Sequence, residues 1–264
     1  STRTVKIVVC IKQVPATGAD KRYTDDLRLD RAAAEAIINP LDEYAIEQAL
    51  RLVDAGSADA VTYLSMGPEQ AAEALRRALA MGGDDAVLVT DPALAGSDEW
   101  ATARVLATAL DRLAPDVALM GMASDDARGS LVPGAVAAMR DVPLLSYGAE
   151  LAVADGKARV RRLSATGYDW IEAPLPVVAS VTDQVGEPRY ASLKGIMAAK
   201  RKPMETWSLA DIGLSAEELR GAALTRVTEA RPPEAKPPTE RIENLPPAEA
   251  AAKIADWLAA RKLI

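Results

Sequence analysis

Residues 121–134, GMASDDARGSLVPG, are the part of the chain best suited to holding a ligand. Small residues at Ser124, Gly129 and Ser130 would let a ligand approach the backbone. Backbone N–H groups in such a loop, together with the N-terminus of a following helix, can hold a phosphate. The segment has neither the Gly-Lys-Ser/Thr of a Walker loop nor a GxGxxG pattern. It therefore predicts a phosphate or nucleotide site without specifying the nucleotide.

Other reactive residue types do not form a catalytic constellation. The chain has no histidine, which excludes a Ser/His/Asp triad, an imidazole base and a His-ligated zinc site. The single cysteine, Cys10, lies among apolar residues, so we expect it to be buried and not reactive. Asp125 and Asp126 could be paired catalytic carboxylates, but adjacent acids in a turn are commonly solvated or cap a helix. We therefore expect no catalytic centre in this chain.

Buried strands that alternate with helices must position these residues. Residues 5–11 are an apolar run interrupted only by Lys6, as in a strand buried on both faces of a parallel sheet. Further strands are predicted at 60–64, 86–89 and 117–120, and helices at 41–55, 69–80, 99–113 and 132–139. The alternation predicts an α/β fold with a doubly wound, mostly parallel sheet. Ligands bind such sheets at the carboxyl ends of the strands, which here precede the loops 10–15, 39–42, 66–68 and 121–134.

The pattern changes to antiparallel strands after residue 150. The pair Asp155-Gly156 between two alternating segments predicts a hairpin, and the apolar run 175–181 predicts a further strand of the same sheet.

The C-terminal part reads as an arm. A helix is predicted at 209–219, the proline-rich and charged residues 231–247 do not suit a folded core, and 248–263 predict an amphipathic helix. We expect an α/β domain over 1–207 and an arm over 208–264. The arm either wraps a partner or is a tail whose helix packs on its own domain.

Residues 187–202, EPRYASLKGIMAAKRK, predict an exposed loop with an apolar tip and a basic end. Exposed apolar residues backed by charge are typical of a place where another protein docks. The alternative is a surface turn that leads into a solvated basic helix.

The charge balance narrows the function classes further. The net charge of −7 argues against a general nucleic-acid binder, because it would not offset phosphate repulsion. The N-terminus has no apolar signal core, and no run reaches the roughly 18 apolar residues that span a bilayer. We expect a cytoplasmic protein that is not inserted in a membrane.

Five segments together resemble the beta subunit of electron transfer flavoprotein. They are KIVVCIKQVP from Lys6, NPLDEYAIEQAL from Asn39, MGPEQA from Met66 with ALAMGGD from Ala78, and residues 187–202. The resemblance covers nearly the whole chain. It implies a flavodoxin-like fold of the adenine nucleotide alpha hydrolase-like kind, paired with an alpha subunit that holds the redox FAD and receives the C-terminal arm. The implied role is to shuttle electrons from acyl-CoA dehydrogenase-type flavoenzymes to a membrane quinone oxidoreductase or another acceptor.

The resemblance also implies which residues bind the nucleotide, a structural AMP in common members and a second FAD in the electron-bifurcating, NADH-using branch. The matching positions are Cys10, Asn39, Pro40, Leu41, Asp42, Met66, Ala123, Ser124, Asp125, Asp126, Ala127, Arg128, Gly129, Ser130, Leu131, Val132, Pro133 and Gly134. Family members often have Lys-Gln and Asp-Gly-Asp in this loop, where this chain has Met122-Ala123 and Asp125-Asp126-Ala127. Both AMP and FAD therefore stay open.

For the partner, the resemblance assigns residues 187–202 to recognition of the dehydrogenase. Leu193 matches the anchoring leucine, with Ile196 and Met197 beside it. The implied partner-binding residues are Tyr190, Leu193, Ile196, Met197, Lys200, Arg201 and Lys202, the three cations steering toward acidic surfaces. A nucleotide-binding module of the universal-stress type would also explain the strands and helices, but not residues 187–202 or the proline-rich arm.

Overall fold

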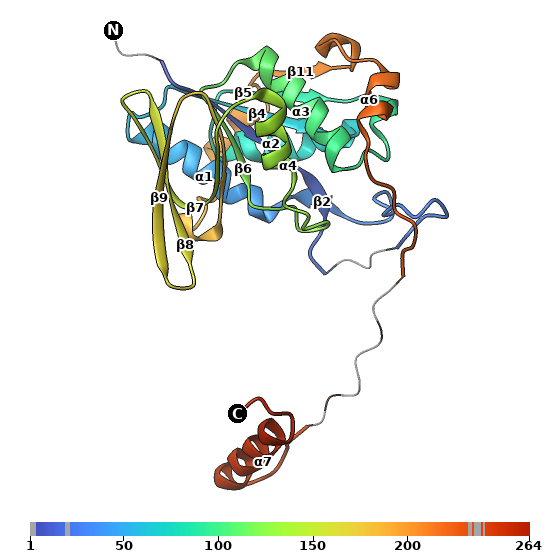
Figure 1. Cartoon of the computed structure of the whole chain (residues 1–264), viewed down its shortest axis with the longest axis vertical. Coiled ribbons are helices and arrows are strands. Elements are labelled where there is room, and N and C mark those ends of the chain that lie inside the picture. Colours follow the sequence, from blue (N-terminus) through green and yellow to red (C-terminus); the bar gives the residue numbers. More distant parts are fainter. Residues whose placement is uncertain (1–3, 19–21, 232–233, 235–238, 240) are drawn as a thin grey trace. The chain divides into compact units, whose positions relative to one another are not determined.

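The computed structural model describes residues 4–18, 22–231, 234, 239 and 241–264. It divides into two compact units, residues 1–228 and 229–264. The first unit is built on a twisted nine-stranded sheet, and the second contains one helix, α7 (Figure 1).

The sheet has the order β11-β5-β4-β1-β6-β10-β7-β8-β9. Its strands are β1 (Lys6–Cys10), β4 (Ala60–Met66), β5 (Asp85–Val89), β6 (Val117–Gly121), β7 (Leu144–Ala154), β8 (Lys157–Ser164), β9 (Gly167–Pro174), β10 (Val177–Val181) and β11 (Met204–Trp207). Neighbours pair in parallel from β11 to β7, whereas β7, β8 and β9 pair antiparallel. The predicted doubly wound, mostly parallel sheet with added strands is confirmed.

Helices cover both faces of the sheet because the central strands carry apolar residues on both sides. Ile7 and Val9 of β1 belong to one buried cluster, and Val8 and Cys10 belong to the other. The first cluster includes residues of α1 (Pro40–Asp54) and α2 (Ala72–Met81), and the second includes residues of α3 (Glu99–Leu113) and α4 (Val132–Arg140). Every predicted helix of this region forms, within a few residues of its expected ends.

The antiparallel part differs from expectation in one strand. The hairpin at Asp155-Gly156 joins β7 to β8 as predicted, and β10 lies within the predicted run 175–181. The edge strand β9 was not predicted. Its residues are largely exposed, so no apolar alternation announces it. The short strands β2 (Gln13–Pro15) and β3 (Ala36–Ile38), which pair antiparallel, were also not predicted.

The predicted helix 209–219 is wrong as a single element. A 3₁₀ turn (Ala210–Ile212) ends at Gly213, whose φ of 75° breaks the helical path, and α6 (Ala216–Ala222) begins after it. Ser215 and Glu218 form a capping box at the start of α6. Three further 3₁₀ turns are Glu69–Ala71, Pro92–Leu94 and Asp183–Val185.

The residues after β11 belong to two different units. Leu209, Ile212, Leu214 and Leu219 are buried in the cluster that packs against α3 and α4, so residues 208–228 are part of the first unit. In the second unit α7 (Pro247–Ala260) has no buried residue. Among the described residues, no helix is long and apolar enough to cross a membrane.

Candidate functional site

The carboxyl ends of β1 and β6 meet where the strand order of the sheet reverses. From β1 the order runs to β4 and β5 on one side and to β6 and β10 on the other. Gly121, at the end of β6, faces the first turn of α1. A Cβ atom there would lie 2.6 Å from both the Leu41 carbonyl oxygen and Asp42 Oδ1. Only glycine permits this close approach, which brings the end of β6 against α1 at the reversal of strand order, where doubly wound sheets have their ligand crevice.

Asn39 ties this crevice to the loop 121–134. Its side chain is fully buried at the start of α1. Its Nδ2 donates to the Ala123 carbonyl oxygen (2.9 Å), and its Oδ1 accepts from the Asp125 N–H (3.0 Å). Asn39 therefore does not cap its own helix and instead holds two backbone groups of the loop across 84 and 86 residues.

Two buried groups, Asp42 in the first turn of α1 and Cys10 at the end of β1, have raised pKa values. Asp42 Oδ2 accepts from the Lys12 N–H (2.8 Å), and burial raises the pKa of Asp42 to about 7. Burial, with Asp42 nearby, also raises the pKa of the Cys10 thiol to about 12. Cys10 is thus a packed, protonated thiol, as expected, and not a nucleophile.

Asp126 forms a buried ion-pair cluster, which corrects the expectation that these adjacent acids are solvated or cap a helix. Its side chain is 1% exposed. Asp126 Oδ1 lies 2.9 Å from Lys12 Nζ, and Oδ2 lies 2.6 Å from an Arg31 guanidinium nitrogen. Burial alone would raise the pKa of Asp126, but the two cations outweigh it and lower the pKa to about 2. Lys12 also donates to Ser124 Oγ (3.2 Å).

The rest of the loop offers backbone donors. Arg128 of the loop pairs with Asp125 (2.6 Å), and Lys12 and Arg31 pair with Asp126, so these three cations are already engaged with carboxylates. Ser130 has a left-handed φ of 58°, and Leu131 is right-handed (φ −81°, ψ −34°) just before α4. Successive residues of opposite hand direct consecutive N–H groups into one concavity, which binds anions. The donor set at residues 130–132 therefore fits a phosphate held by amides at the N-terminus of α4.

The remaining predicted nucleotide residues lie around the same crevice with different exposure. Pro40 and Leu41 are half-buried in the first turn of α1, and Pro133 is buried in α4 with half-buried Val132 and Gly134 beside it. Ala127 and Gly129 are exposed at the loop tip. Met66 ends β4, which is separated from β6 by β1, so it is the one predicted residue one strand away from the loop.

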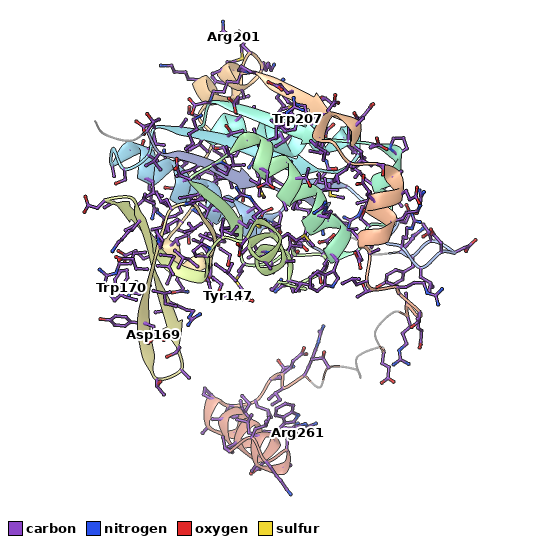
Figure 2. The ribbon with its side chains drawn as sticks, turned by 45° about the horizontal axis from the view of Figure 1, so that its top comes forward. Tyr147, Asp169, Trp170, Arg201, Trp207 and Arg261 are labelled. Carbon is purple, nitrogen blue, oxygen red and sulfur yellow. The ribbon has the colours of Figure 1, made fainter. Side chains whose placement is uncertain are left out.

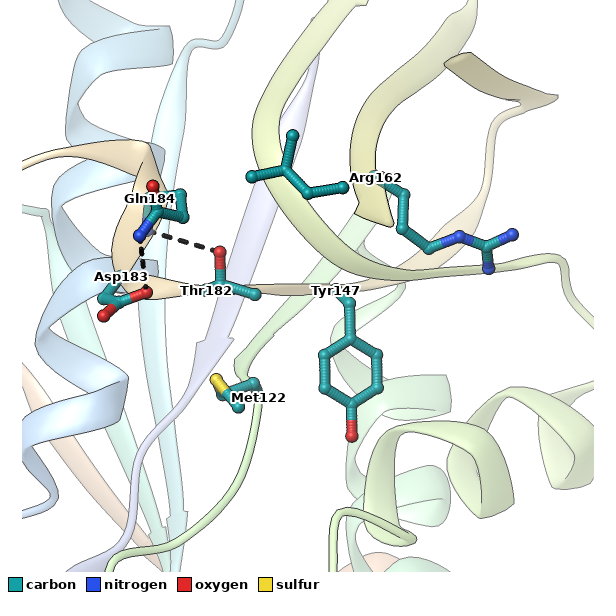
Figure 3. A pocket seen from close by; sticks show the side chains of 7 residues that line it. Met122, Tyr147, Arg162, Thr182, Asp183 and Gln184 are labelled. Atoms are coloured by element: carbon teal, nitrogen blue, oxygen red, sulfur yellow. Dashed lines mark hydrogen bonds between the residues drawn. The ribbon is translucent and has the colours of Figure 1, made fainter. Parts of the chain in front are cut away.

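A hollow of about 330 Å³ adjoins the crevice. It is lined by Met122, Tyr147, Arg162, Leu163, Thr182, Asp183 and Gln184. Figure 3 shows Tyr147 and Arg162 pointing in different directions, so these two side chains do not converge on a common point. Met122 directly follows β6 and joins the hollow to the loop 121–134.

Residues 187–202, called the recognition segment from here on, contain a short helix in addition to the predicted loop. Helix α5 (Leu193–Ala199) begins at Ser192, whose Oγ accepts from the Gly195 N–H (3.0 Å). The apolar tip consists of four side chains, Tyr190 (95% exposed), Leu193 (78%), Ile196 and Met197. The expected exposed tip is therefore present, carried on a defined helix.

The basic end of the recognition segment divides into two roles. Lys200 and Arg201 are exposed, and Arg201 projects outward from the first unit (Figure 2). Lys202 does not, because its Nζ donates to the Leu79 carbonyl oxygen (2.9 Å). The Lys202 carbonyl oxygen in turn accepts from Arg76 (2.8 Å), which also binds the Ala199 carbonyl (2.6 Å). Lys202 is therefore an anchor on α2, contrary to its predicted steering role.

Several residues of both sites escaped the sequence analysis. Lys12 lies in a loop that was considered, but nothing local indicates that it meets Asp126, 114 residues away. Arg31 lies outside the predicted elements altogether. Glu47, in the middle of α1, was also not predicted. A buried acid in the middle of an otherwise apolar helical face would have been the signal.

The comparisons with known proteins agree over nearly the full length. The model of the electron transfer flavoprotein domain matches residues 26–212. The electron transfer flavoprotein subunit beta of Mycobacterium tuberculosis is 38% identical, covering 98% of this chain and 99% of the relative. A caffeyl-CoA reductase-Etf complex subunit, CarD, of Acetobacterium woodii is 35% identical over 98% and 100%. The Megasphaera elsdenii subunit beta is 38% identical over 75% of this chain and 76% of the relative. With its flavodoxin-like sheet, this chain belongs to the electron transfer flavoprotein family, as one of its beta subunits.

Proposed function

We propose that this chain and an alpha subunit form a heterodimeric electron carrier in which alpha holds most of the redox FAD. We also propose that this chain has no catalytic residues of its own. The observation that carries the proposal is the apolar tip, displayed on a helix that is anchored to the α/β unit. A surface of this kind serves contact and release, not bond-making. The donor would be an acyl-CoA dehydrogenase-type flavoenzyme, and the acceptor a quinone oxidoreductase or another electron carrier.

We further propose that the crevice between β1 and β6 holds one AMP with a structural role. Its phosphate would be bound by the amides of residues 130–132, because the nearby cations are already paired with Asp125 and Asp126. A site made of a few amides suits the single phosphate of AMP better than it suits the two phosphates of a dinucleotide. When the heterodimer with alpha binds FAD, the FAD supplies the electron transfer. The residues of this chain orient and enclose the bound nucleotide.

Nucleotide content tests both parts of this proposal. The chain is co-expressed with its alpha subunit, the complex is purified, and the nucleotides are extracted and quantified. One FAD and one AMP per heterodimer are expected. Two FAD would replace the AMP assignment by the bifurcating alternative, which NADH reduction would then report. A chain that binds AMP but pairs with no flavoprotein would favour the universal-stress type of module.

The docking role is tested at Leu193. Leu193→Ala removes the most exposed aliphatic side chain of the tip, so we expect the KM for the reduced dehydrogenase to rise about tenfold, the loss of a buried anchor of about 1–2 kcal/mol. Nucleotide content should not change. Leu224→Ala is the control, since Leu224 is also exposed but lies outside the recognition segment. Equal KM values for the two variants would remove the anchor role.

A further inference from the structure

One helix, α1, holds the amino-terminal half of the recognition segment. Arg51 donates to the carbonyl oxygens of Val185 (2.5 Å) and Glu187 (3.2 Å). Gly186, between them, has a φ of 104°, and a Cβ there would lie 2.9 Å from the Arg51 guanidinium. The left-handed φ of Gly186 favours glycine there, and the two hydrogen bonds from Arg51 hold the chain on either side of it as it enters the segment.

Glu47 is the centre of this anchor. Its Oε2 accepts from both the N–H and Nε of Arg189 (3.0 and 2.8 Å), and its Oε1 accepts from Arg51 Nε (2.7 Å). The Glu47 side chain is 5% exposed. Burial opposes its ionisation, but Arg189 and Arg51 outweigh burial and hold the pKa of Glu47 below its usual value. Arg189 also reaches Asp54 (2.8 Å).

The tip depends on such anchors because its own side chains pack on little. Tyr190 directly follows Arg189 and is almost fully exposed. Helix α5 has seven residues, too few to be stable in isolation. Its carboxyl end is fixed on α2 by Arg76 and Lys202. The backbone immediately before the tip is fixed by the hydrogen bond that the Arg189 N–H donates to Glu47.

We propose that Glu47 is a positioning residue for partner recognition: through Arg189 it fixes the direction in which Tyr190 and Leu193 meet the partner. This rests on the docking role proposed above and deepens it. A tip that is already ordered loses less conformational freedom when it docks, so it binds more tightly for the same contacts. Because the Glu47 side chain is buried, its effect on the partner would pass through Arg189.

Amide hydrogen exchange in the heterodimer tests the anchor without any partner. Glu47→Gln keeps the size of the side chain but removes its charge. We expect the amides of residues 188–199 to exchange at least tenfold faster. Glu43→Gln is the matched control, because Glu43 lies one turn earlier on α1 and pairs with Arg77 (4.0 Å) instead of Arg189. Arg189→Gln breaks the same contact from the more exposed side and serves if Glu47→Gln folds poorly.

Electron-transfer kinetics with a purified acyl-CoA dehydrogenase, reduced by its acyl-CoA substrate, test the consequence. Glu47→Gln should raise the KM for the dehydrogenase about fivefold and leave kcat within twofold. If Glu47 acts by placing Leu193, the same change should cost less than twofold in a Leu193→Ala background. A general loss of stability would instead give equal factors in both backgrounds.

The outcomes separate this inference from the proposed function. Unchanged exchange at residues 188–199 in both Glu47→Gln and Arg189→Gln, or equal KM factors in the two backgrounds, overturns the positioning role. An unchanged KM in Leu193→Ala overturns the docking role instead, and the exchange experiment still decides whether Glu47 orders the segment.

Discussion

At the scale of single residues, the candidate site is a set of long-range polar contacts between short loops. Lys12, Asn39 and Asp126 come from three different parts of the sequence and meet at the ends of β1 and β6. The sequence predicts the loop because small and polar residues follow a buried strand. It could not predict the ion pairs, because adjacent acids in a turn look alike whether solvated or buried. Asp126 shows that a distant lysine and arginine decide the difference.

The buried carboxyl of Asp42 should make the stability of the protein depend on pH. Its pKa is about 7 in the folded protein and 3.8 ordinarily, so between these values the folded state holds a proton that the unfolded state releases. The contribution of Asp42 to the free energy of unfolding is therefore greatest below pH 4. It is lost as the pH rises through 7, and the total loss is up to about 4 kcal/mol.

Asp42→Asn removes this titration and keeps an oxygen for the Lys12 N–H. We expect the wild-type protein to lose stability relative to the variant between pH 4.5 and 7.5. Urea unfolding of both proteins across this range measures the difference. Parallel stability curves would contradict a raised pKa of Asp42. Asp126 does not confound the comparison, because its pKa of about 2 lies below the window.

At the scale of elements, apolar sequence patterns predict the strands and helices that pack in the core and miss those that stay exposed. The central parallel strands β1, β4, β5, β6 and β10 and the helices α1 to α4 could be predicted because they bury apolar residues in regular patterns. Strand β11 has only four residues, two of them exposed, and β9 is exposed along most of its length. These two strands form by backbone hydrogen bonds to β5 and β8 at the edges of the sheet. The pattern of their own side chains does not indicate this pairing.

The seat of helix α5 on α2 is an element-scale contact that glycine makes possible. A Cβ at Gly195 would lie 2.3 Å from the Ala80 carbonyl oxygen, a backbone atom that cannot turn aside. Gly195→Ala should therefore push α5 away from α2 and lower the free energy of unfolding by about 1–3 kcal/mol. We also expect faster amide exchange in residues 193–199.

The matched control is Gly221→Ala in α6. Gly221 has no atom within 4 Å of an added Cβ, so alanine there should stabilise the protein by about 0.5–1 kcal/mol. Denaturant unfolding of both variants gives the comparison. If Gly195→Ala proved as stable as Gly221→Ala, α5 would not be seated as closely on α2 as the structure has it.

At the scale of the whole molecule, all of the buried core found among the described residues lies in the first unit. Residues 208–228, assigned from sequence to the arm, pack on it instead. Asp98 Oδ2 accepts from the N–H groups of Leu224 and Thr225 (2.9 and 2.8 Å), which fixes the chain just before the unit ends. Helix α7 carries Ile254 and Trp257 at 49% and 38% exposure with nothing buried. An amphipathic helix without a buried residue is one that still has a face to cover.

Removing the second unit should separate folding from assembly. A chain that ends at Thr228 keeps both buried clusters and the Asp98 contacts. We expect its free energy of unfolding to stay within about 0.5 kcal/mol of the full chain, because both buried clusters are made of residues before 229. We propose that the arm binds the alpha subunit, as the resemblance to the family implies, so the truncated chain should yield much less heterodimer on co-expression. Denaturant unfolding of the isolated chains and gel filtration of the co-expressed pairs measure the two effects.

A large loss of stability in the truncated chain would instead show that the arm packs on its own domain. An undiminished yield of heterodimer would show that the first unit, and not the arm, binds alpha.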